Sequence, residues 1–581
     1  MNQPHTISPL ETSTKTTPTP DGFALVRQHL GALPVVNHYL ERAGLPALLE
    51  RYLPARDARV KIPPAVIVRL IVTNLLVGRE PLYALGEWAA PFVPALLGMT
   101  PAQHCGINDD RAGRALTALF DADRASMLTD LILHVVDEFG INTDELHNDS
   151  TSISVSGLYR DADGRPRGGK PTPVITFGHS KDHRPDLKQL VWILTIADDG
   201  AVPITYRLAP GNTNDDPTHI PTWDHLAVLL GRTNFLYIAD SKLASTAAMT
   251  HIHSRGGRFI TVLPRSRRED GYFRDWAATH PPIWTEAFRH PARHDEPDQV
   301  YSTFTSPLPS AEGHRVIWIH STAKAARDSF IRRDKIEAGA AAIDVLQARL
   351  TGPKCRLKTI VAIEKEADIA LKKAGASRWM ETTITASVTY TYPKASRGRA
   401  AADSPFHRVS HTTHTITAHA LPDVIARDAT TDGCFPLVTN DQTLTNTEVL
   451  AAYRYQPNLE RHHHLLKGVQ HADPLLLRDP ARIEALFCCH FLALVIAALI
   501  EREIRTAMAD AHTHDIPLYP ELRACPSPSA ERILEIFAPL TQDELHHNDE
   551  YVKTFVPELT DLQIQVLNLL SIPTTTYTAR P

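Results

Sequence analysis

Residues 453–467, YRYQPNLERHHHLLK, determine how the rest of the chain is interpreted. Pro457 suits the first turn of a helix, where its missing N–H is not needed. Glu460, His464 and Lys467 follow at spacings of four and three residues, so a helix presents them on one face. A carboxylate, an imidazole and an ammonium on one stripe are usually a solvated, ion-paired surface. Two aspartates earlier in the chain support a second interpretation.

These aspartates lie in segments that are predicted to be strands. Asp149 lies in LHNDSTSISVSG (146–157), where polar and apolar residues alternate, and Asp240 ends the apolar run FLYIAD (235–240). Three more strand-like segments are 191–197, 202–208 and 258–264. The order of three strands, helix, strand, helix, strand predicts a mixed α/β sheet. We expect Asp149 and Asp240 to lie on neighbouring strands of this sheet.

Composition limits the class of protein. A chain of 581 residues is too long for one core and suggests three or four domains, and 43% hydrophobic with 22% charged residues is typical of a soluble globular protein. The net charge of −6 means that nucleic-acid binding would depend on local basic patches. No two of the six cysteines form a CxxC pair, which fits a reducing cytoplasm. The apolar run 486–500 is shorter than a bilayer span, so we expect a buried helix and no membrane contact.

The chain divides into segments of different pattern. The helical segment after the tail suits either DNA binding or dimerisation. Within the insertion, residues 358–364 are read as a strand, and Thr541 with Glu544 near the C-terminus forms a capping-box pattern for a helix. The predicted segments are a disordered tail (1–22), a helical N-terminal domain (23–140), a first core part (141–264), a β-rich insertion (265–440), a second core part (441–509) and a helical C-terminal region (510–581).

The chemistry of the candidate site follows from its carboxylates. Each aspartate by itself is usually a turn former at a strand end. Asp149, Asp240 and Glu460 together offer only oxygen ligands, which suit Mg²⁺ or Mn²⁺. Two such ions could activate a nucleophile and stabilise the leaving oxygen in phosphoryl transfer.

Two further features bear on DNA. The segment 159–188 has seven Arg or Lys residues against four Asp, a local net charge of +3, which favours a loop that faces DNA. Its candidate contacts are Lys181, Arg184 and Lys188. The tract His462-His463-His464 cannot chelate one ion, because consecutive side chains on a helix point about 100° apart. We therefore interpret the tract as solvated or facing DNA.

The sequence resembles bacterial insertion-sequence DDE transposases of the insertion-sequence-four superfamily, whose signature is Tyr-x2-Arg-x3-Glu-x6-Lys. Tyr453, Glu460 and Lys467 match the signature in register. Gln456 stands in place of the arginine and weakens one expected phosphate contact, although Arg454 and Arg461 are close by. The resemblance covers residues 23–510. Other matching stretches are HNDST (147–151), GHSKDHRPDLKQ (178–189), GNTNDD (211–216) and ADSK (239–242).

The resemblance implies an RNase H-like (retroviral-integrase-like) core interrupted by a β-rich insertion. It implies Asp149, Asp240 and Glu460 as catalytic residues that hold two Mg²⁺ or Mn²⁺ ions, and Tyr453 and Lys467 as DNA contacts, with Arg461 close by. The expected activity is cleavage at the element's terminal inverted repeats and joining to target DNA, by a homodimer in the bacterial cytoplasm at the nucleoid. Two alternatives stay open: a metal-dependent nuclease without strand transfer, and an inactive DNA-binding regulator.

Overall fold

The computed structural model describes residues 21–578 except 56–59, 292–296, 353–354, 396, 400–403 and 473–476. It divides into two compact units, one formed by Met1–Thr261 with Ala452–Pro581 and the other by Val262–Ala451. The tail predicted over residues 1–22 lies outside the described residues except for its last two.

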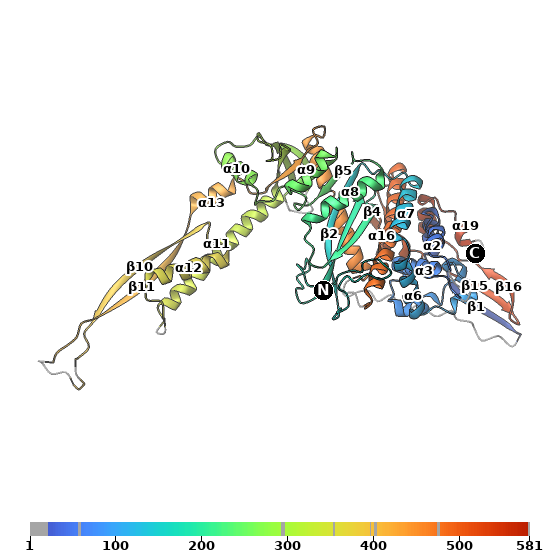
Figure 1. Cartoon of the computed structure of the whole chain (residues 1–581), viewed down its shortest axis with the longest axis horizontal. Helices are drawn as coiled ribbons and strands as arrows, with labels where there is room; N and C mark the ends of the chain where they lie inside the picture. The colour runs from blue at the N-terminus through green and yellow to red at the C-terminus, as the bar shows by residue number, and fades with distance from the viewer. Residues whose placement is uncertain are drawn as a thin grey trace. The chain divides into compact units, whose positions relative to one another are not determined.

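The first unit contains a mixed sheet, as the strand pattern predicts (Figure 1). Its strands lie in the order β4 (Pro203–Pro210), β3 (Lys188–Ala197), β2 (Glu145–Val155), β5 (Leu236–Ala239) and β6 (Arg258–Val262). The first three strands pair antiparallel, whereas β5 runs parallel to β2 and β6 runs parallel to β5. Nine of the ten residues of β3 are buried, which explains its near-continuous apolar run.

Helix α16 (Pro480–Asp510) packs against this sheet through aromatic side chains. Trp192 of β3 lies 5.5 Å from Phe487, and Tyr206 of β4 lies 4.9 Å from Phe491, both measured between ring centroids. Among the described residues, α16 is the one helix that is long and apolar enough to cross a membrane, but 89% of its most apolar window is buried inside the structure. Its composition is therefore explained by a position in the protein core.

The N-terminal and C-terminal regions are not purely helical, so that part of the prediction is wrong. Strand β1 (Phe23–His29) pairs with β15 (Thr541–His547), which also pairs with β16 (Glu550–Phe555). Thr541 and Glu544 therefore lie in a strand, because pairing with β1 outweighs the local capping pattern. The helices of the N-terminal region are α1 (Leu33–Arg42), α2 (Leu45–Tyr52), α3 (Pro64–Val77), α4 (Leu85–Ala89), α5 (Pro101–His104), α6 (Asp109–Asp121) and α7 (Arg124–Glu138).

The remaining elements of the first unit are short. The α-helices of this unit between β4 and α16 are α8 (His219–Leu230), α9 (Thr246–Ser254) and α15 (Gln456–His464), with α14 (Asn446–Tyr453) leading from one unit into the other. Toward the C-terminus lie β13 (Ile516–Tyr519), β14 (Arg523–Cys525), α17 (Ala530–Glu535), α18 (Asp561–Leu569) and α19 (Thr575–Thr578).

The second unit contains long helices as well as strands. Residues 358–364, predicted as a strand, instead lead into α12, where Thr359 caps the helix and Ile363, Ala367 and Leu371 are buried. The helical period of these apolar residues continues beyond the predicted strand. The elements of this unit are α10 (Arg268–Ala277), β7 (Thr285–His290), β8 (Gln299–Thr305), β9 (Arg315–Ser321), α11 (Thr322–Leu350), α12 (Ile360–Ala374), β10 (Met380–Thr391), β11 (Val409–Ala420), α13 (Pro422–Ala429) and β12 (Cys434–Thr439).

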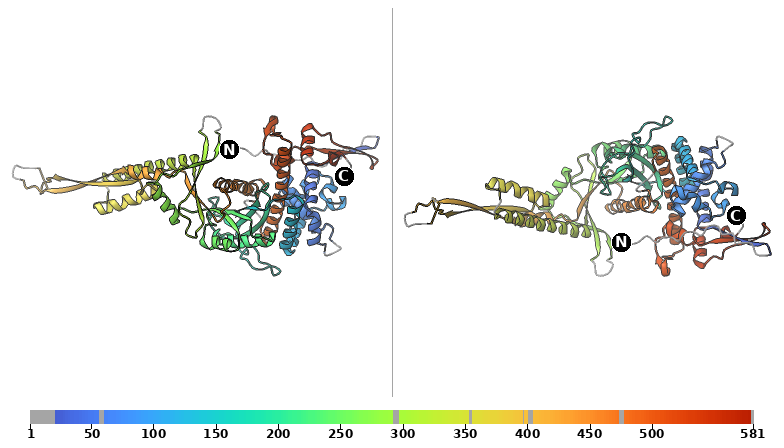
Figure 2. Two further views of the ribbon diagram at one scale, coloured as in Figure 1. Left: turned by 90° about the horizontal axis from the view of Figure 1, so that it is seen from above. Right: turned by 90° about the horizontal axis from the view of Figure 1, so that it is seen from below.

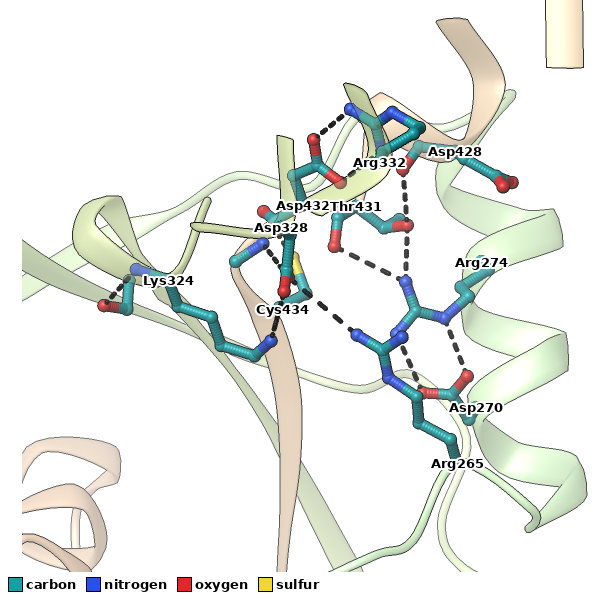
Figure 3. A network of polar contacts seen from close by, with 12 residues as sticks. Arg265, Asp270, Arg274, Lys324, Asp328, Arg332, Asp428, Thr431, Asp432 and Cys434 are labelled. Atoms are coloured by element: carbon teal, nitrogen blue, oxygen red, sulfur yellow. Dashed lines mark hydrogen bonds and ion pairs between the residues drawn. The ribbon is translucent and has the colours of Figure 1, made fainter. Parts of the chain in front are cut away.

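A network of polar contacts holds α10 and α11 to the turn that precedes β12 in the second unit (Figure 3). Arg332 of α11 donates to both carboxylate oxygens of Asp432, at 2.7 and 2.5 Å. Arg274 of α10 donates to the Thr431 hydroxyl at 2.7 Å, so the turn before β12 is held from two helices. Bidentate arginine pairs of this kind fix geometry as well as charge.

Gly339 allows α11 to approach the neighbouring segment closely. A Cβ at this position would lie 2.6 Å from the Ala376 Cβ and 2.8 Å from the Met380 sulfur, so Gly339→Ala is expected to destabilise this unit by about 1–3 kcal/mol. Hydrogen exchange of peptides from α11 and α12 measures the effect. Gly271→Ala in α10 is the control, because nothing lies within 4 Å of its Cβ and no loss is expected.

Candidate active site

The register of two parallel strands brings Asp149 and Asp240 together. Asn148 of β2 is paired with Ala239 of β5, so the two aspartates occupy the next position on adjacent strands. Asp149 lies within β2, whereas Asp240 follows the last residue of β5. The prediction that these aspartates lie on neighbouring strands is confirmed.

Asp149 is half-buried, and its side chain is 26% exposed. Its Oδ1 accepts a hydrogen bond from the Ser150 N–H at 2.7 Å, and the Lys181 ammonium lies 3.9 Å away. Burial raises the pKa of Asp149 to about 6, although Lys181 and the Ser150 hydrogen bond favour the charged form. The negative charges of Asp240 and Asp215 raise this pKa further. Lys181 therefore compensates the charge of this carboxylate only in part, and a further cation near Asp149 would be favourable.

Asp240 is held at the start of the turn that follows β5. Its Oδ1 accepts a hydrogen bond from the Lys242 N–H at 3.0 Å, and its backbone carbonyl accepts one from the Thr261 hydroxyl at 2.6 Å. Burial raises the pKa of Asp240, and the charge of Asp215 raises it further. Both aspartates therefore share one electrostatic environment.

Asp215 is a third carboxylate of this environment that the sequence analysis did not single out. Its Oδ1 accepts a hydrogen bond from the Ser150 hydroxyl at 2.5 Å, and its Oδ2 lies 3.5 Å from the Lys181 ammonium. Lys181 also donates to the Ser150 carbonyl at 2.5 Å. The only signal in the sequence is the stretch 211–216, where two adjacent aspartates follow a strand.

Glu460 borders the same region from α15, which packs against β2. His463 lies three residues further along this helix, and therefore on the same face, with its Nε2 3.7 Å from the Asp149 Oδ2. Glu460 itself is exposed. Burial raises the pKa of Tyr453 to about 12, and the charges of Asp240, Glu460 and Asp149 add to the rise. Tyr453 is thus within electrostatic range of all three carboxylates.

The interpretation of the histidine tract as solvated or DNA-facing is wrong for two of its three residues. His462 and His463 are 6% and 7% exposed, whereas His464 is exposed. Burial lowers the pKa of His462 to about 4 and that of His463 to about 3, so both are neutral at pH 7. His462 contacts the Ala201 carbonyl at 2.7 Å. The tract was misread because Leu459 and Leu466 place the buried stripe of the helix across it.

Lys467 lies in a π-helical turn, Leu465–Val469, that continues α15. Its ammonium donates to the Asp182 Oδ2 at 2.6 Å and its side chain is 17% exposed. The structure therefore gives this lysine an internal acidic partner in the loop that precedes β3. Its role as a DNA contact stays a prediction.

The other predicted DNA contacts are placed in several environments. Arg461 donates to Glu501, at 2.5 Å, and Arg184 pairs with Asp186 at 2.8 Å. Lys188 donates to the Leu158 carbonyl at 2.7 Å. Among the contacts described for these four residues, only those of Lys181 are with carboxylates of the candidate site. DNA contact by these four side chains stays a prediction.

The donor set fits a hard divalent cation. Asp149 and Asp240 offer carboxylate oxygens at adjacent positions, and Mg²⁺ is commonly bound through one or two carboxylates with water and phosphate completing its shell. Within the part of the chain that the structure describes, no three His, Cys, Asp or Glu side chains are grouped closely enough to hold an ion. Glu460 therefore stands apart from the pair in this structure.

We expect Lys467→Ala to weaken DNA binding and to lower the slope of log K against log salt by about 0.9, the value for one phosphate contact. Fluorescence anisotropy at several salt concentrations measures both. Asp182→Asn is the matched variant, because it releases Lys467 from its partner and is expected to leave the slope unchanged or steeper. An unchanged slope in Lys467→Ala would mean that this lysine serves only the internal pair, worth about 0–1 kcal/mol.

Comparison with known proteins places one match in the N-terminal region. A family model described as "Domain of unknown function (DUF4277)" matches residues 25–133. No curated protein matches the chain. Among solved structures, the chain is similar to the "Cryo-EM structure of piggyBac transposase synaptic complex with hairpin DNA", with a TM-score of 0.34 and 6% identity over 87% of this chain and 79% of that one. The family match includes none of Asp149, Asp240 and Glu460, so the assignment of these residues depends on the geometry described above.

Proposed function

We propose that this chain is a DDE-type DNA transposase with an RNase H-like core. The observation that carries the proposal is the adjacent position of Asp149 and Asp240 on parallel strands, beside the helix that bears Glu460. The strand order β4-β3-β2-β5-β6, antiparallel on one side of β2 and parallel on the other, supports the core fold that the sequence resemblance implies.

Two Mg²⁺ or Mn²⁺ ions are proposed as cofactors, held by Asp149, Asp240 and Glu460. When bound, such ions would activate a nucleophile and stabilise the leaving oxygen of a phosphodiester. Lys181 would keep the carboxylates in place through its contacts with Asp149, Asp215 and Ser150. Since Glu460 is exposed on its helix, we propose that it completes the site when DNA is bound.

The proposed reaction has two phosphoryl transfers. In the first, water attacks a phosphodiester at the element end, and the bond to the 3′ oxygen breaks to free a 3′-OH. In the second, this 3′-OH attacks a phosphodiester of the target DNA and displaces the target's own 3′ oxygen. Each transfer forms one P–O bond and breaks one, so neither needs a covalent enzyme intermediate.

Incubation of the purified chain with its own element ends, a supercoiled target plasmid and Mg²⁺ tests the proposal. A transposase yields cut ends and joined products, whereas a nuclease yields cut ends alone. A chain that binds the ends but does neither would be a DNA-binding regulator. Loss of all cutting with intact binding would overturn the enzymatic proposal.

We also propose that a homodimer in the bacterial cytoplasm pairs the two terminal inverted repeats, because a two-fold axis relates two equal sites most simply. Multi-angle light scattering of the complex with end DNA is expected to give two chains for two ends. A mass that corresponds to one chain per pair of ends would contradict the dimer.

A further inference from the structure

Strands β10 and β11 form a long two-stranded ribbon in the second unit. They pair antiparallel without a bulge from Met380 opposite Ala420 to Thr391 opposite Val409. Figures 1 and 2 show this ribbon running beside α11 and α12 and then continuing past them. The ribbon therefore has an inner part that is covered by helices and an outer part that is not.

The inner part is anchored in a small hydrophobic core. Met380 and Ile416 are buried with residues of α11 and α12, and Ile384 packs against the same cluster. The Gln347 side chain of α11 also accepts a hydrogen bond from the Ile416 N–H at 2.7 Å. Beyond this anchor, every residue of Thr385–Thr391 and all of Val409–Thr415 except the half-buried His414 are exposed.

The two faces of the outer ribbon carry different groups. One face is a ladder of hydroxyls with one imidazole, because paired residues of an antiparallel ribbon point to the same side. On the other face the Arg408 guanidinium lies 4.9 Å from the centre of the Tyr390 ring. The pairs that form the ladder are Thr385 with Thr415, Ser387 with Thr413, and Thr389 with His411.

The charge of the ribbon is opposite in sign to that of the chain. The positive charge lies in the connection between the two strands, residues 392–408, which contains four Lys or Arg residues and one Asp, a local net charge of +3, whereas the whole chain has −6. Arg397, Arg399 and Arg408 are exposed. A two-stranded ribbon is only marginally stable without further packing. Seven residue pairs that are exposed except for His414, and that end in this basic connection, therefore indicate a surface kept for an anionic partner.

We infer that the outer part of the β10–β11 ribbon is an arm that binds a groove of double-stranded DNA. A two-stranded ribbon fits the major groove, which is about 12 Å wide. Seven residues at about 3.4 Å each extend over roughly 24 Å, the length of about seven base pairs. The hydroxyl ladder would face base edges while the arginines contact phosphates. The inference rests on the proposed function in that its partner is DNA.

The test uses the full chain with a shortened ribbon, in which Asn-Gly replaces residues 387–413 between the paired residues Ala386 and His414. This change keeps the anchor and closes the hairpin with a favourable turn. Anisotropy on a labelled 30-base-pair duplex of arbitrary sequence, in EDTA and at several salt concentrations, measures binding without cleavage. We expect at least tenfold weaker binding, with the salt slope lower by about 2–3 because up to three arginine–phosphate contacts are lost.

A charge reversal tests whether the positive charge of the arm contributes to DNA binding while the ribbon itself is kept. Arg397→Glu with Arg399→Glu is expected to lower the salt slope by about 1.8. The control is Lys365→Glu with Lys372→Glu, which reverses two exposed lysines on α12 and is expected to leave the slope unchanged. Equal effects of the two double variants would overturn the arm, because they would reflect net charge alone.

Other outcomes separate the arm from the proposed function. If the shortened chain binds DNA as tightly as the intact chain does, the inference of a DNA-binding arm is wrong and the transposase proposal stands. If the intact chain binds through the ribbon but never cuts its element ends, the arm stands and the enzymatic proposal fails. If sedimentation shows that the shortened chain has lost a dimer while its affinity for DNA is unchanged, the ribbon binds a second copy of the chain and the DNA inference is overturned.

Discussion

Asp149→Asn is expected to lower the rate of DNA cleavage by about 10³-fold or more while DNA affinity stays unchanged. The carboxylate is expected to hold a metal ion whose contribution is several kcal/mol, and each 1.36 kcal/mol is tenfold in rate. Asparagine keeps the size of the side chain and an oxygen that can accept from the Ser150 N–H. Single-turnover cleavage of labelled element ends measures the rate, and anisotropy in EDTA measures the affinity.

The matched control for this variant is Asp186→Asn, because Asp186 is an exposed carboxylate paired with Arg184 outside the candidate site. We expect it to cut at the wild-type rate. Asp240→Asn and Glu460→Gln are expected to share the loss seen in Asp149→Asn. A variant of any of the three that cuts normally would remove that residue from the catalytic set.

Asp149→Asn is also expected to stabilise the metal-free protein against unfolding. The pKa of Asp149 is raised to about 6 from an ordinary value of 3.8, so the folded state binds a proton more tightly than the unfolded state does. This contribution to stability is complete below pH 3.8 and is lost as the pH rises through 6. Asp149→Asn should therefore gain at most about 3 kcal/mol at pH 7.5 and nothing near pH 3.5. Unfolding in EDTA at both pH values measures the difference.

The sequence was sufficient to predict strands and helices where the local residue pattern agrees with the burial seen in the structure. The five strands of the first sheet were predicted because each is a short apolar or alternating run, ended by turn residues. The pairing of β1 with β15 could not be predicted, since it joins segments more than 500 residues apart. The start of α12 was misread because Ile360–Glu364 suits either structure over so few residues, and only the later Ala367 and Leu371 extend the helical period.

The candidate site, too, could be predicted only in part from the sequence. Asp149 and Asp240 were predicted to lie on neighbouring strands, and the pairing of β2 with β5 confirms this, although β3 and β4 lie between these two strands in the chain. The contacts of Lys181 with Asp149 and Asp215, and the burial of His463 beside Asp149, depend on how loops and a helix pack onto that sheet. No spacing in the sequence encodes them. The pairing of Lys467 with Asp182 likewise depends on this packing.

Removal of divalent cations is expected to abolish cleavage, with Mg²⁺ or Mn²⁺ restoring it and Ca²⁺ supporting DNA binding with little turnover. Ca²⁺ takes longer bonds and a looser geometry than Mg²⁺, which suits binding better than an in-line displacement. The ion must also compete with a proton for Asp149, whose metal-free pKa is about 6. At subsaturating Mg²⁺ the cleavage rate should therefore fall as the pH is lowered through 6, up to tenfold per pH unit if one proton competes.

Two measurements separate this competition from a general acid sensitivity of the fold. Raising the Mg²⁺ concentration should move the midpoint of the rate profile to lower pH, because more metal displaces the proton. Mn²⁺ binding followed by electron paramagnetic resonance should weaken over the same pH range in the wild type and be much weaker at every pH in Asp149→Asn. Full cleavage in EDTA would refute the metal mechanism. A midpoint that does not move with Mg²⁺ concentration would mean that the titrating group is not a ligand of the ion.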